Sequence, residues 1–209
     1  MELPGFDARI PAIAGIFMFD YFGVLISIIF GLALTHLLRG LGRLIQLRHE
    51  ARPYWVHLVW TINIVIFALA IWWGMYWWKE LLSWTALWFF FIAAYAIAIF
   101  MWAYLLFPQE FAPDLDFEAY FYANRRWFFG IQTLVFLMDI PETLRKGTLH
   151  LRPVPAAYPF VIAGLLVMSV IGLVSANRRV HSVLCIAWLL LTLGYLFFSS
   201  LARIAHGIS

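Results

Sequence analysis

The stretch FYANRRWFFGIQTLVFLMDIPE, residues 121–142, decides how many times this chain crosses a membrane. It contains two adjacent arginines, continues as a mostly apolar run and ends in Asp139 and Glu142. A segment of this kind either crosses the bilayer as a helix or lies along its surface. The choice sets the topology of everything that follows it in the chain.

The rest of the chain is strongly apolar. Of its 209 residues, 65% are hydrophobic, 19% are aromatic and only 12% are charged, and the mean hydropathy is +0.88. A soluble domain needs more polar residues than this to cover its surface. Long apolar runs without regular alternation are typical of membrane helices and not of outer-membrane barrels. We therefore expect an all-α integral membrane protein that forms one transmembrane domain over residues 1–209.

Six segments are candidates for membrane spans. A span needs about 20 apolar residues to cross a hydrocarbon core of ~30 Å. The clear cases are residues 17–38, 54–78, 84–107 and 182–201, and residues 158–176 are slightly shorter. Residues 117–140 would form a helix of about 36 Å, which is enough to cross with some tilt. We predict six spans, with five as the alternative in which residues 117–140 stay at the surface.

The placement of arginine predicts the orientation. The connection RGLGRLIQLRHEARP, residues 39–53, holds four arginines, and the positive-inside rule places it in the cytoplasm. Six spans put eight Lys and Arg residues inside and six outside, whereas five spans put ten inside and four outside. Charge bias alone therefore favours five spans mildly, and either distribution is tolerable.

The polar residues of the disputed segment favour six spans. Glu118, Arg125, Gln132 and Asp139 are spaced by seven, so they form one narrow stripe of a helix, with a drift of only ~20° per step. A helix at the membrane surface usually has a broad basic face instead. We predict that the stripe, with Asp20 of the first span, lines a polar path, and that Glu118 can pair with Arg125. The alternative is that the arginines reach lipid phosphates, Asp139 reaches outer water and Gln132 bonds a neighbouring helix.

A weak internal similarity points the same way. FGVLISIIFGLALTHLLRG, residues 22–40, and FGIQTLVFLMDIPETLRKG, residues 129–147, begin with Phe-Gly and end with a basic residue and Gly at equal length. Two halves of three spans each would insert with opposite orientation, as in transporters built from inverted repeats. The sequence thus suggests a 3+3 inverted repeat.

The first predicted span carries a line of small residues. Gly23, Ser27, Gly31 and Thr35 recur every fourth position and form a helix-packing groove of the small-xxx-small type. The pattern predicts close approach of another helix. It leaves open whether that helix belongs to the same chain or to a second subunit.

Histidines and one asparagine are secondary candidates. His36, His57 and His181 gather at the predicted cytoplasmic side, where two of them are potential axial ligands for a b-type haem. They also lie near span ends, where histidine is tolerated without a metal, so we predict no cofactor and keep haem as the alternative. Asn63 and its neighbours His57 and Thr61 are expected to form interhelical hydrogen bonds first and ligand contacts second. The single cysteine, Cys185, excludes a disulfide within the chain and a cysteine metal cluster.

Aromatic and acidic residues mark two connections. The second and third predicted spans are joined by a short connection rich in aromatics, which predicts an aromatic belt on the outer side; an aromatic cage for an organic cation is the alternative. The acidic stretch PQEFAPDLDFEAY, residues 108–120, predicts an aspartate N-cap on the next helix. The aromatic residues are Trp72, Trp73, Tyr76, Trp77, Trp78, Trp84 and Trp88.

No motif for phosphate binding, metalloprotease or serine-nucleophile chemistry occurs, so we expect no enzyme. We predict a channel-like or transporter-like path for an ion or small solute, built as an oligomer. The alternatives are a non-catalytic scaffold or sensor subunit that docks partner helices and, third, an intramembrane haem or redox protein. We expect a plasma-membrane location with an uncleaved N-terminus, and as partners the lipid bilayer and either a second copy or another membrane subunit. The scattered basic residues argue against nucleic acid.

Overall fold

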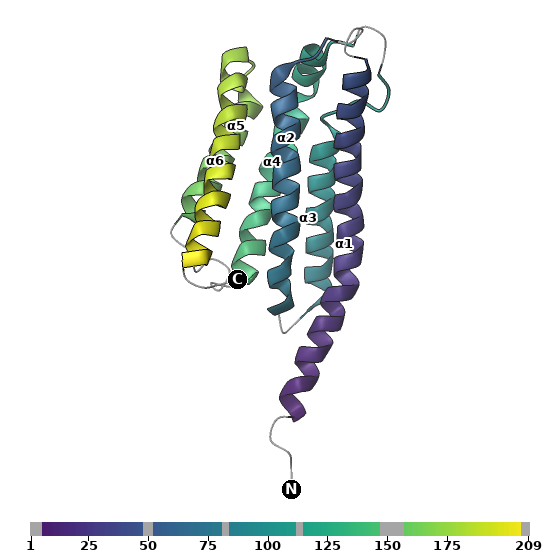
Figure 1. Ribbon diagram of the computed structural model, residues 1–209, viewed down its shortest axis with the longest axis vertical. Helices are drawn as coiled ribbons and strands as arrows, with labels where there is room; N and C mark the ends of the chain where they lie inside the picture. Colours follow the sequence, from purple (N-terminus) through teal and green to yellow (C-terminus); the bar gives the residue numbers. More distant parts are fainter. Residues whose placement is uncertain (1–5, 48–51, 81–83, 112–114, 147–156, 206–209) are drawn as a thin grey trace.

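A computed structural model of the chain describes residues 6–47, 52–80, 84–111, 115–146 and 157–205 (Figure 1). Within these residues every regular element is helical, and the only β-type pairing is an isolated bridge between Arg52 and Asp116. The elements are α1 (Phe6–Gln46), α2 (Trp55–Gly74), the 3-10 helix η1 (Met75–Glu80), α3 (Ala86–Tyr104), α4 (Phe117–Lys146), α5 (Tyr158–Val174) and α6 (Arg178–Ala205).

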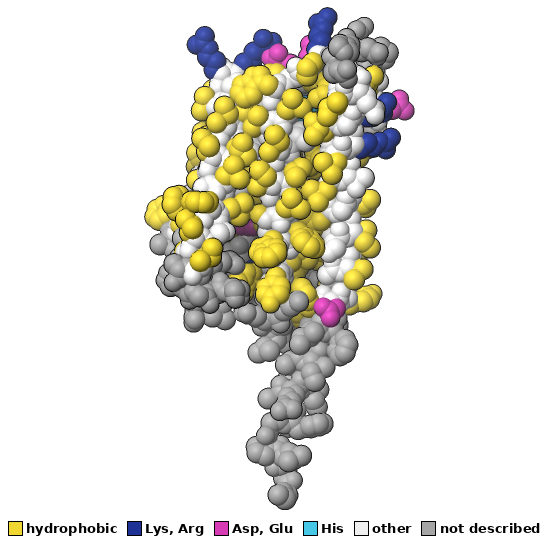
Figure 2. Space-filling model, in the orientation of Figure 1, with side chains coloured by type: hydrophobic (Ala, Val, Ile, Leu, Met, Phe, Trp, Pro, Cys, Tyr) yellow, Lys and Arg dark blue, Asp and Glu magenta, His cyan; other side chains and the backbone are white. Residues whose placement is uncertain are grey.

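The predicted helical membrane bundle is confirmed. Four stretches are long and apolar enough to cross a bilayer, namely Phe19–Gln46, Trp55–Trp78, Ala86–Tyr104 and Arg178–Ala202, and Tyr158–Val174 is a shorter apolar helix. Apolar side chains cover most of the described part of the face seen in Figure 2, while basic side chains gather toward one end. We call this end, which includes Arg39, Arg43, Arg178 and Arg179, the arginine-rich end. The start of α1 and the end of α6 lie toward the opposite end (Figure 1).

The disputed segment is a bundle helix. α4 runs alongside the other five long helices and does not lie across their ends (Figure 1). It packs between α3 and α5, and it extends six residues beyond the predicted end at residue 140. Its buried residues include both apolar and polar side chains, so α4 is held by the interior of the bundle and not by its surface.

The helices form a closed ring in the order α1, α3, α4, α5, α6, α2, and α2 also contacts α3 and α4. The two halves of the chain therefore pack differently. α1 lies against α2 and α3, whereas the backbone of α4 lies against α5 and, among the described residues, not against α6. The inverted repeat suggested by the sequence is thus not reproduced in these neighbour relations.

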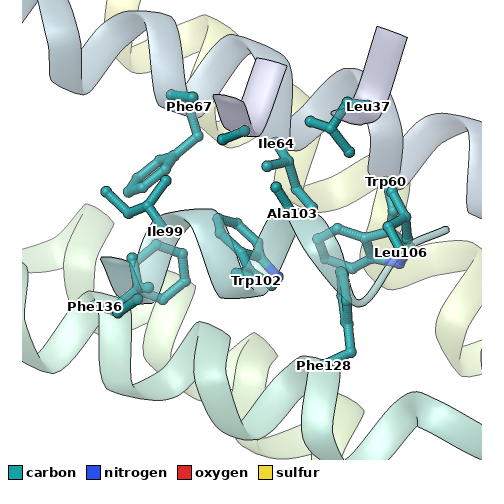
Figure 3. Packing of buried hydrophobic residues seen from close by; sticks show 14 of the residues in the cluster. Leu37, Trp60, Ile64, Phe67, Ile99, Trp102, Ala103, Leu106, Phe128 and Phe136 are labelled. Atoms are coloured by element: carbon teal, nitrogen blue, oxygen red, sulfur yellow. The ribbon is translucent and has the colours of Figure 1, made fainter. Parts of the chain in front are cut away.

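Aromatic residues fill the middle of the bundle (Figure 3). Trp102 of α3 packs against Phe136 of α4 and Trp188 of α6, with ring centroids 6.0 and 6.1 Å apart. Trp60 of α2 meets Phe128 of α4 edge to face at 5.3 Å. Such pairs contribute about 0.5–1.5 kcal/mol each beyond the area that they bury. They form a dense layer that links α2, α3, α4 and α6.

Small residues promote close packing on α5 and at Gly40 of α1, where the Phe107 ring lies at the position of a Cβ, but not along the predicted groove. Ser169 and Gly172 of α5 are buried, and a Cβ on Gly172 would come within 2.5 Å of the Phe129 ring of α4. On α1 a Cβ at Gly23 or Gly31 would have no neighbour within 4 Å. The rest of the predicted groove, Ser27 and Thr35, is exposed, and Ser27 accepts a hydrogen bond from the indole of Trp72 at 3.1 Å.

The two ends of the bundle are finished by local polar and aromatic contacts. At the arginine-rich end, Asp116 accepts hydrogen bonds from the backbone amides of Glu118 and Ala119, which confirms the predicted aspartate cap on α4. At the opposite end Trp73 and Tyr76 are 71% and 62% exposed, as expected for an aromatic belt. Trp78 departs from this pattern, because it is buried.

Candidate functional site

The polar stripe of α4 faces the interior of the bundle. Gln132 is 0% exposed, Asp139 is 6% exposed and Arg125 is 8% exposed, while Glu118 at the start of the helix is partly buried. The spacing by seven therefore predicted their common face correctly. Polar groups at such depth are costly unless they are paired or hydrated, so the partners of each side chain indicate what the stripe does.

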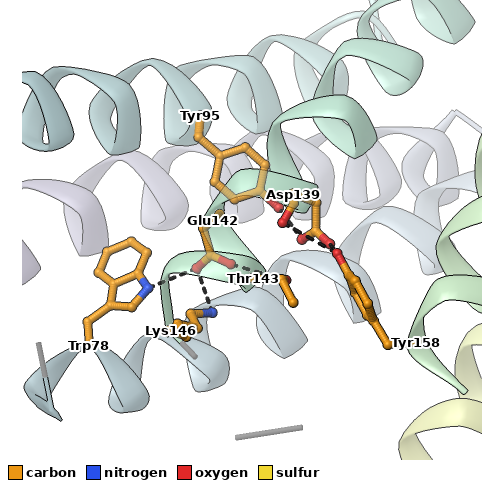
Figure 4. A network of polar contacts seen from close by, with 7 residues as sticks. All are labelled: Trp78, Tyr95, Asp139, Glu142, Thr143, Lys146 and Tyr158. Carbon is orange, nitrogen blue, oxygen red and sulfur yellow. Dashed lines mark hydrogen bonds and ion pairs between the residues drawn. The ribbon is translucent and has the colours of Figure 1, made fainter. Parts of the chain in front are cut away.

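Asp139 is held by two tyrosines from the helices on either side of α4. Tyr95 of α3 donates its hydroxyl to Oδ1 at 2.8 Å, and Tyr158 of α5 donates to Oδ2 at 2.7 Å (Figure 4). Both carboxylate oxygens are thus engaged by neutral donors. Among the described residues no basic side chain forms an ion pair with Asp139.

Glu142 lies one turn further along α4 and has a charged partner. Its Oε1 is 2.5 Å from Nζ of Lys146 and accepts a hydrogen bond from the indole of Trp78 at 2.8 Å (Figure 4). Both ionic side chains are at most 5% exposed. The spacing of four residues places Glu142 and Lys146 on one side of the helix, where such pairs form.

Pro141 interrupts the backbone hydrogen bonding of α4 between the two carboxylates, although the helix continues to Lys146. It has no backbone N–H, so the carbonyl of Leu137 cannot receive its regular helical hydrogen bond. The lost hydrogen bond lies close to both Asp139 and Glu142 in the chain.

These groups border a cavity of about 410 Å³. It lies between α2, α4, α5 and α6, toward the end of the bundle opposite the arginine-rich end. Acidic atoms are visible at the floor of a hollow between apolar side chains on this face (Figure 2). The polar lining residues are Asp139, Glu142, Thr143, Lys146, Tyr158, Thr192, Tyr195, Ser199 and Ser200, and aromatic walls are added by Phe67, Trp73 and Trp77.

Two buried polar side chains near this cavity have no hydrogen-bond partner within the part of the chain that the structure describes. Thr192 of α6 lines the cavity, is 7% exposed, and its hydroxyl is unpaired. Gln132 lies two turns of α4 from Asp139 on the same face, and neither its amide nitrogen nor its oxygen has a partner. Buried polar groups are normally paired, so both positions call for a partner outside the protein, such as water or a solute.

Glu118 and Asp20, two of the predicted path residues, do not lie where the sequence analysis expected them. Glu118 pairs with Arg178 of α6 at 2.6 Å and not with Arg125, because its side chain is near the start of α6 across the arginine-rich end. Asp20 is exposed on α1, and α1 is not a neighbour of α4 among the described residues. Asp20 is therefore separate from the stripe, and the expected Glu118–Arg125 pair is wrong.

The histidines lie in aromatic surroundings at the other end. His36 stacks on Tyr104 with centroids 4.8 Å apart, and the Phe107 ring lies against both His36 and His57. His181 contacts the backbone carbonyl of Ser175 through Nε2 at 2.9 Å. Each imidazole thus fills a packed position. Among the described residues no three His, Cys, Asp or Glu side chains are grouped to hold a metal ion.

Asn63 forms the interhelical hydrogen bond that the sequence predicted. Its side-chain nitrogen donates to the backbone carbonyl of Cys185 at 3.0 Å and joins α2 to α6. Thr61 differs from the prediction, since its hydroxyl donates to the carbonyl of His57 within its own helix at 3.0 Å. Such back-bonding is the usual way for a threonine to satisfy itself inside a helix.

Several residues of the site were not predicted. Glu142 and Lys146 carried a usable signal, because a Glu and a Lys four residues apart on a helix commonly pair. For Tyr95, Tyr158 and Thr192 the sequence held no such signal, since each lies in an apolar run of a different helix. Only the packing of α3, α5 and α6 around α4 brings them to the two carboxylates.

A second hollow, of about 730 Å³, opens at the arginine-rich end. It lies between the end of α1 and the segment after α3, and it is lined by Arg39 and Arg43. The guanidinium of Arg43 sits 5.0 Å from the ring centroid of Phe111. Glu110 also lines this hollow, so its charge is mixed.

No protein-family model matches this chain, and no curated protein or solved structure is detectably similar to it.

Proposed function

We propose that this protein carries a small solute across the membrane, in the manner of a transporter, and that the cavity beside Asp139 and Glu142 is its binding site. The main observation behind the proposal is the buried side-chain amide of Gln132. This amide has no partner and lies on the same helix face as the cavity carboxylate Asp139. Burying an amide without a partner costs roughly 1–3 kcal/mol of stability. This cost is avoided when water or solute reaches the amide during a transport cycle.

The route is not an open pore in this state. The aromatic layer of Trp60, Trp102, Phe128, Phe136 and Trp188 fills the middle of the bundle. A solute in the cavity would reach the arginine-rich end only after these rings move. The arrangement therefore favours two alternating states over continuous conduction, and Pro141 supplies an interruption in α4 at which the helix can bend.

The residues of the site would have different roles in binding the solute. Asp139 and Glu142 would hold the solute, and Tyr95 and Tyr158 would fix the orientation of the Asp139 carboxylate. Gln132 would form the next contact inward, two turns deeper along α4. Arg125, at 8% exposure, would mark the far end of the buried stripe.

Thiol labelling tests this route. Thr192→Cys and Gln132→Cys are each introduced in a Cys185→Ala background, and the protein in liposomes is treated with methyl methanethiosulfonate, a small neutral reagent. We expect both new thiols to react, because the cavity and the stripe take up water during the cycle. The wild-type Cys185 is the control: it lies on α6 seven residues before Thr192, is 0% exposed, and should stay unmodified.

Each outcome decides between functions. Labelling at both positions supports the path. Labelling of Thr192→Cys alone would indicate a closed binding pocket, as in a sensor, and would overturn the path. Protection of both thiols would indicate a dry bundle and overturn the proposal altogether.

A non-catalytic docking subunit is the second candidate, and one observation favours it. The small residues of α1 face outward with open space beside Gly23 and Gly31. A partner helix could approach closely along this line. If thiol labelling finds a dry bundle, a membrane partner that co-purifies with wild-type protein and is lost with Gly31→Leu would support this second function.

A further inference from the structure

Among the described residues, the charges around the cavity leave one negative group without a cationic partner. Lys146 and Glu142 form a close pair and neutralise one another. Within the part of the chain that the structure describes, the Asp139 carboxylate is bound by the neutral hydroxyls of Tyr95 and Tyr158 and by no basic side chain. When all three ionic groups are charged, the site therefore carries a net charge of one negative unit, which a single positive charge would balance.

Five aromatic side chains form part of the cavity wall, and aliphatic side chains form the rest of its apolar surface. The aromatic residues are Phe67 and Trp73 of α2, Trp77 of η1, Tyr158 of α5 and Tyr195 of α6. Aromatic faces attract cations, and they favour ammonium groups that carry alkyl substituents. A carboxylate beside a wall that is partly aromatic and partly aliphatic is thus a suitable setting for an organic cation.

The hydroxyl of Thr192 is an independent sign of a missing ligand. It is unpaired and nine-tenths buried on a wall of this cavity. A bound hydroxyl, ammonium or water would satisfy it. The position is on α6, so it is separate in the chain from the carboxylates of α4.

The size of the cavity argues for an organic ligand. About 410 Å³ falls within the range of roughly 300–1,000 Å³ that small-molecule sites occupy. A bare inorganic cation instead prefers a tight shell of about six oxygen ligands. The oxygen-bearing side chains here are spread around a cavity of about 410 Å³, and no group of three His, Cys, Asp or Glu side chains is close enough to hold a metal ion among the described residues.

From these observations, and resting on the function proposed above, we infer that the cavity binds a monovalent organic cation, an ammonium or quaternary ammonium group on a small apolar body. Asp139 supplies the countercharge, the aromatic side chains of the wall hold the alkyl groups, and Thr192 provides a polar contact. This organic cation would be the class of solute that the proposed path carries.

Protection from thiol labelling tests the inference. Thr192→Cys protein, with Cys185→Ala, is treated with methyl methanethiosulfonate in the presence of choline chloride. Parallel samples contain 3,3-dimethyl-1-butanol, the neutral isostere of choline, or sodium chloride at the same ionic strength. We expect choline to slow labelling, while the isostere and sodium chloride leave the rate unchanged.

A variant that removes the negative charge of Asp139 provides a second test. With Asp139→Asn added, labelling should continue, and the choline concentration that gives half-protection should rise about tenfold, which corresponds to 1.4 kcal/mol. Equal protection by the neutral isostere, or no protection by choline, would overturn the inference. Unchanged half-protection in the folded Asp139→Asn protein would overturn it as well. If that variant does not fold, the comparison of choline with its isostere still decides.

Failure of the proposed function and failure of the inferred solute class give different labelling results. A thiol at position 192 that never reacts overturns the proposed function. A thiol that reacts freely but is not protected by choline overturns only the cationic class of the solute.

Discussion

At the residue scale, two ion pairs of the same chemical type sit in opposite environments. Glu142 and Lys146 are both at most 5% exposed, whereas Arg178 in the pair with Glu118 is 77% exposed. A buried charge that loses its partner keeps its desolvation cost, and a surface charge returns to water. The same neutralising substitution should therefore have very different effects at the two sites.

We predict that Glu142→Gln lowers the free energy of unfolding by on the order of 3 kcal/mol, because Lys146 loses its charged partner inside the bundle. Glu118→Gln, the matched control, should lower it by about 0–1 kcal/mol. Unfolding of both variants in mixed detergent micelles measures the difference. Equal losses in the two variants would contradict the burial argument.

Tyr158 provides a second prediction at this scale. Tyr158→Phe removes the hydroxyl that donates to Oδ2 of Asp139 at 2.7 Å and leaves the ring in place. We expect a loss of about 1.5–3 kcal/mol in the same unfolding measurement, the usual range for a hydrogen bond to a charged group. Tyr21→Phe is the control, since Tyr21 is 74% exposed on α1, and its unfolding should change little. A loss at Tyr21 as large as at Tyr158 would mean that the carboxylate contact is not the cause.

At the scale of elements, the α4–α5 contact depends on a missing side chain. The buried Phe129 ring of α4 rests where a Cβ on Gly172 would lie. This close approach places α5, and with it Tyr158, beside Asp139. A helix that separated from α4 by one methyl group would disturb packing throughout the interface, because interiors are densely filled.

We predict that Gly172→Ala destabilises the protein by about 1–3 kcal/mol, the usual cost of overpacking a filled core. Gly194→Ala on α6 is the control, since a Cβ there would have no neighbour within 4 Å. It should be neutral or slightly stabilising, because alanine has the higher helix propensity. Thermal unfolding in detergent checks both, and a Gly172→Ala variant as stable as the wild type would refute the close contact.

At the scale of the whole molecule, six helices that alternate in direction place the start of α1 and the end of α6 toward one end of the bundle (Figure 1). The polar helix α4 completes this alternation, although it is less apolar than its neighbours. Its stripe of Arg125, Gln132 and Asp139 faces inward, and Trp127, Leu134 and Leu137 are among the apolar residues that it exposes.

This arrangement predicts the result of a topology measurement. Reporters that are active on only one side of the membrane are placed after Ser209 and between residues 147 and 156. Both should report the outside, and a reporter between residues 48 and 51, at the arginine-rich connection, should report the inside. Inside signals from the first two sites would mean that residues 117–140 do not cross.

The sequence by itself determined the helical membrane class, the positions of the apolar helices and the common face of Arg125, Gln132 and Asp139. These features follow from composition and from the helical repeat, which act locally along the chain. The end of α4 was misplaced by six residues, because proline usually ends a helix and charged residues usually end an apolar span, whereas Glu142 and Lys146 pair inside this helix.

Only the tertiary structure decided which helices meet. Asp139 needs Tyr95 and Tyr158 from α3 and α5, and the cavity needs Thr192 from α6, and none of these positions differs from its apolar neighbours in a way that periodicity reveals. The small residues of α1 and α5 look equally suited to packing, yet a neighbouring ring occupies the Cβ position only at Gly40 of α1 and Gly172 of α5 among the described glycines, and Gly23 and Gly31 have open space. The physical reason is that contacts between helices depend on the shapes of both surfaces together, whereas a sequence pattern describes one helix at a time.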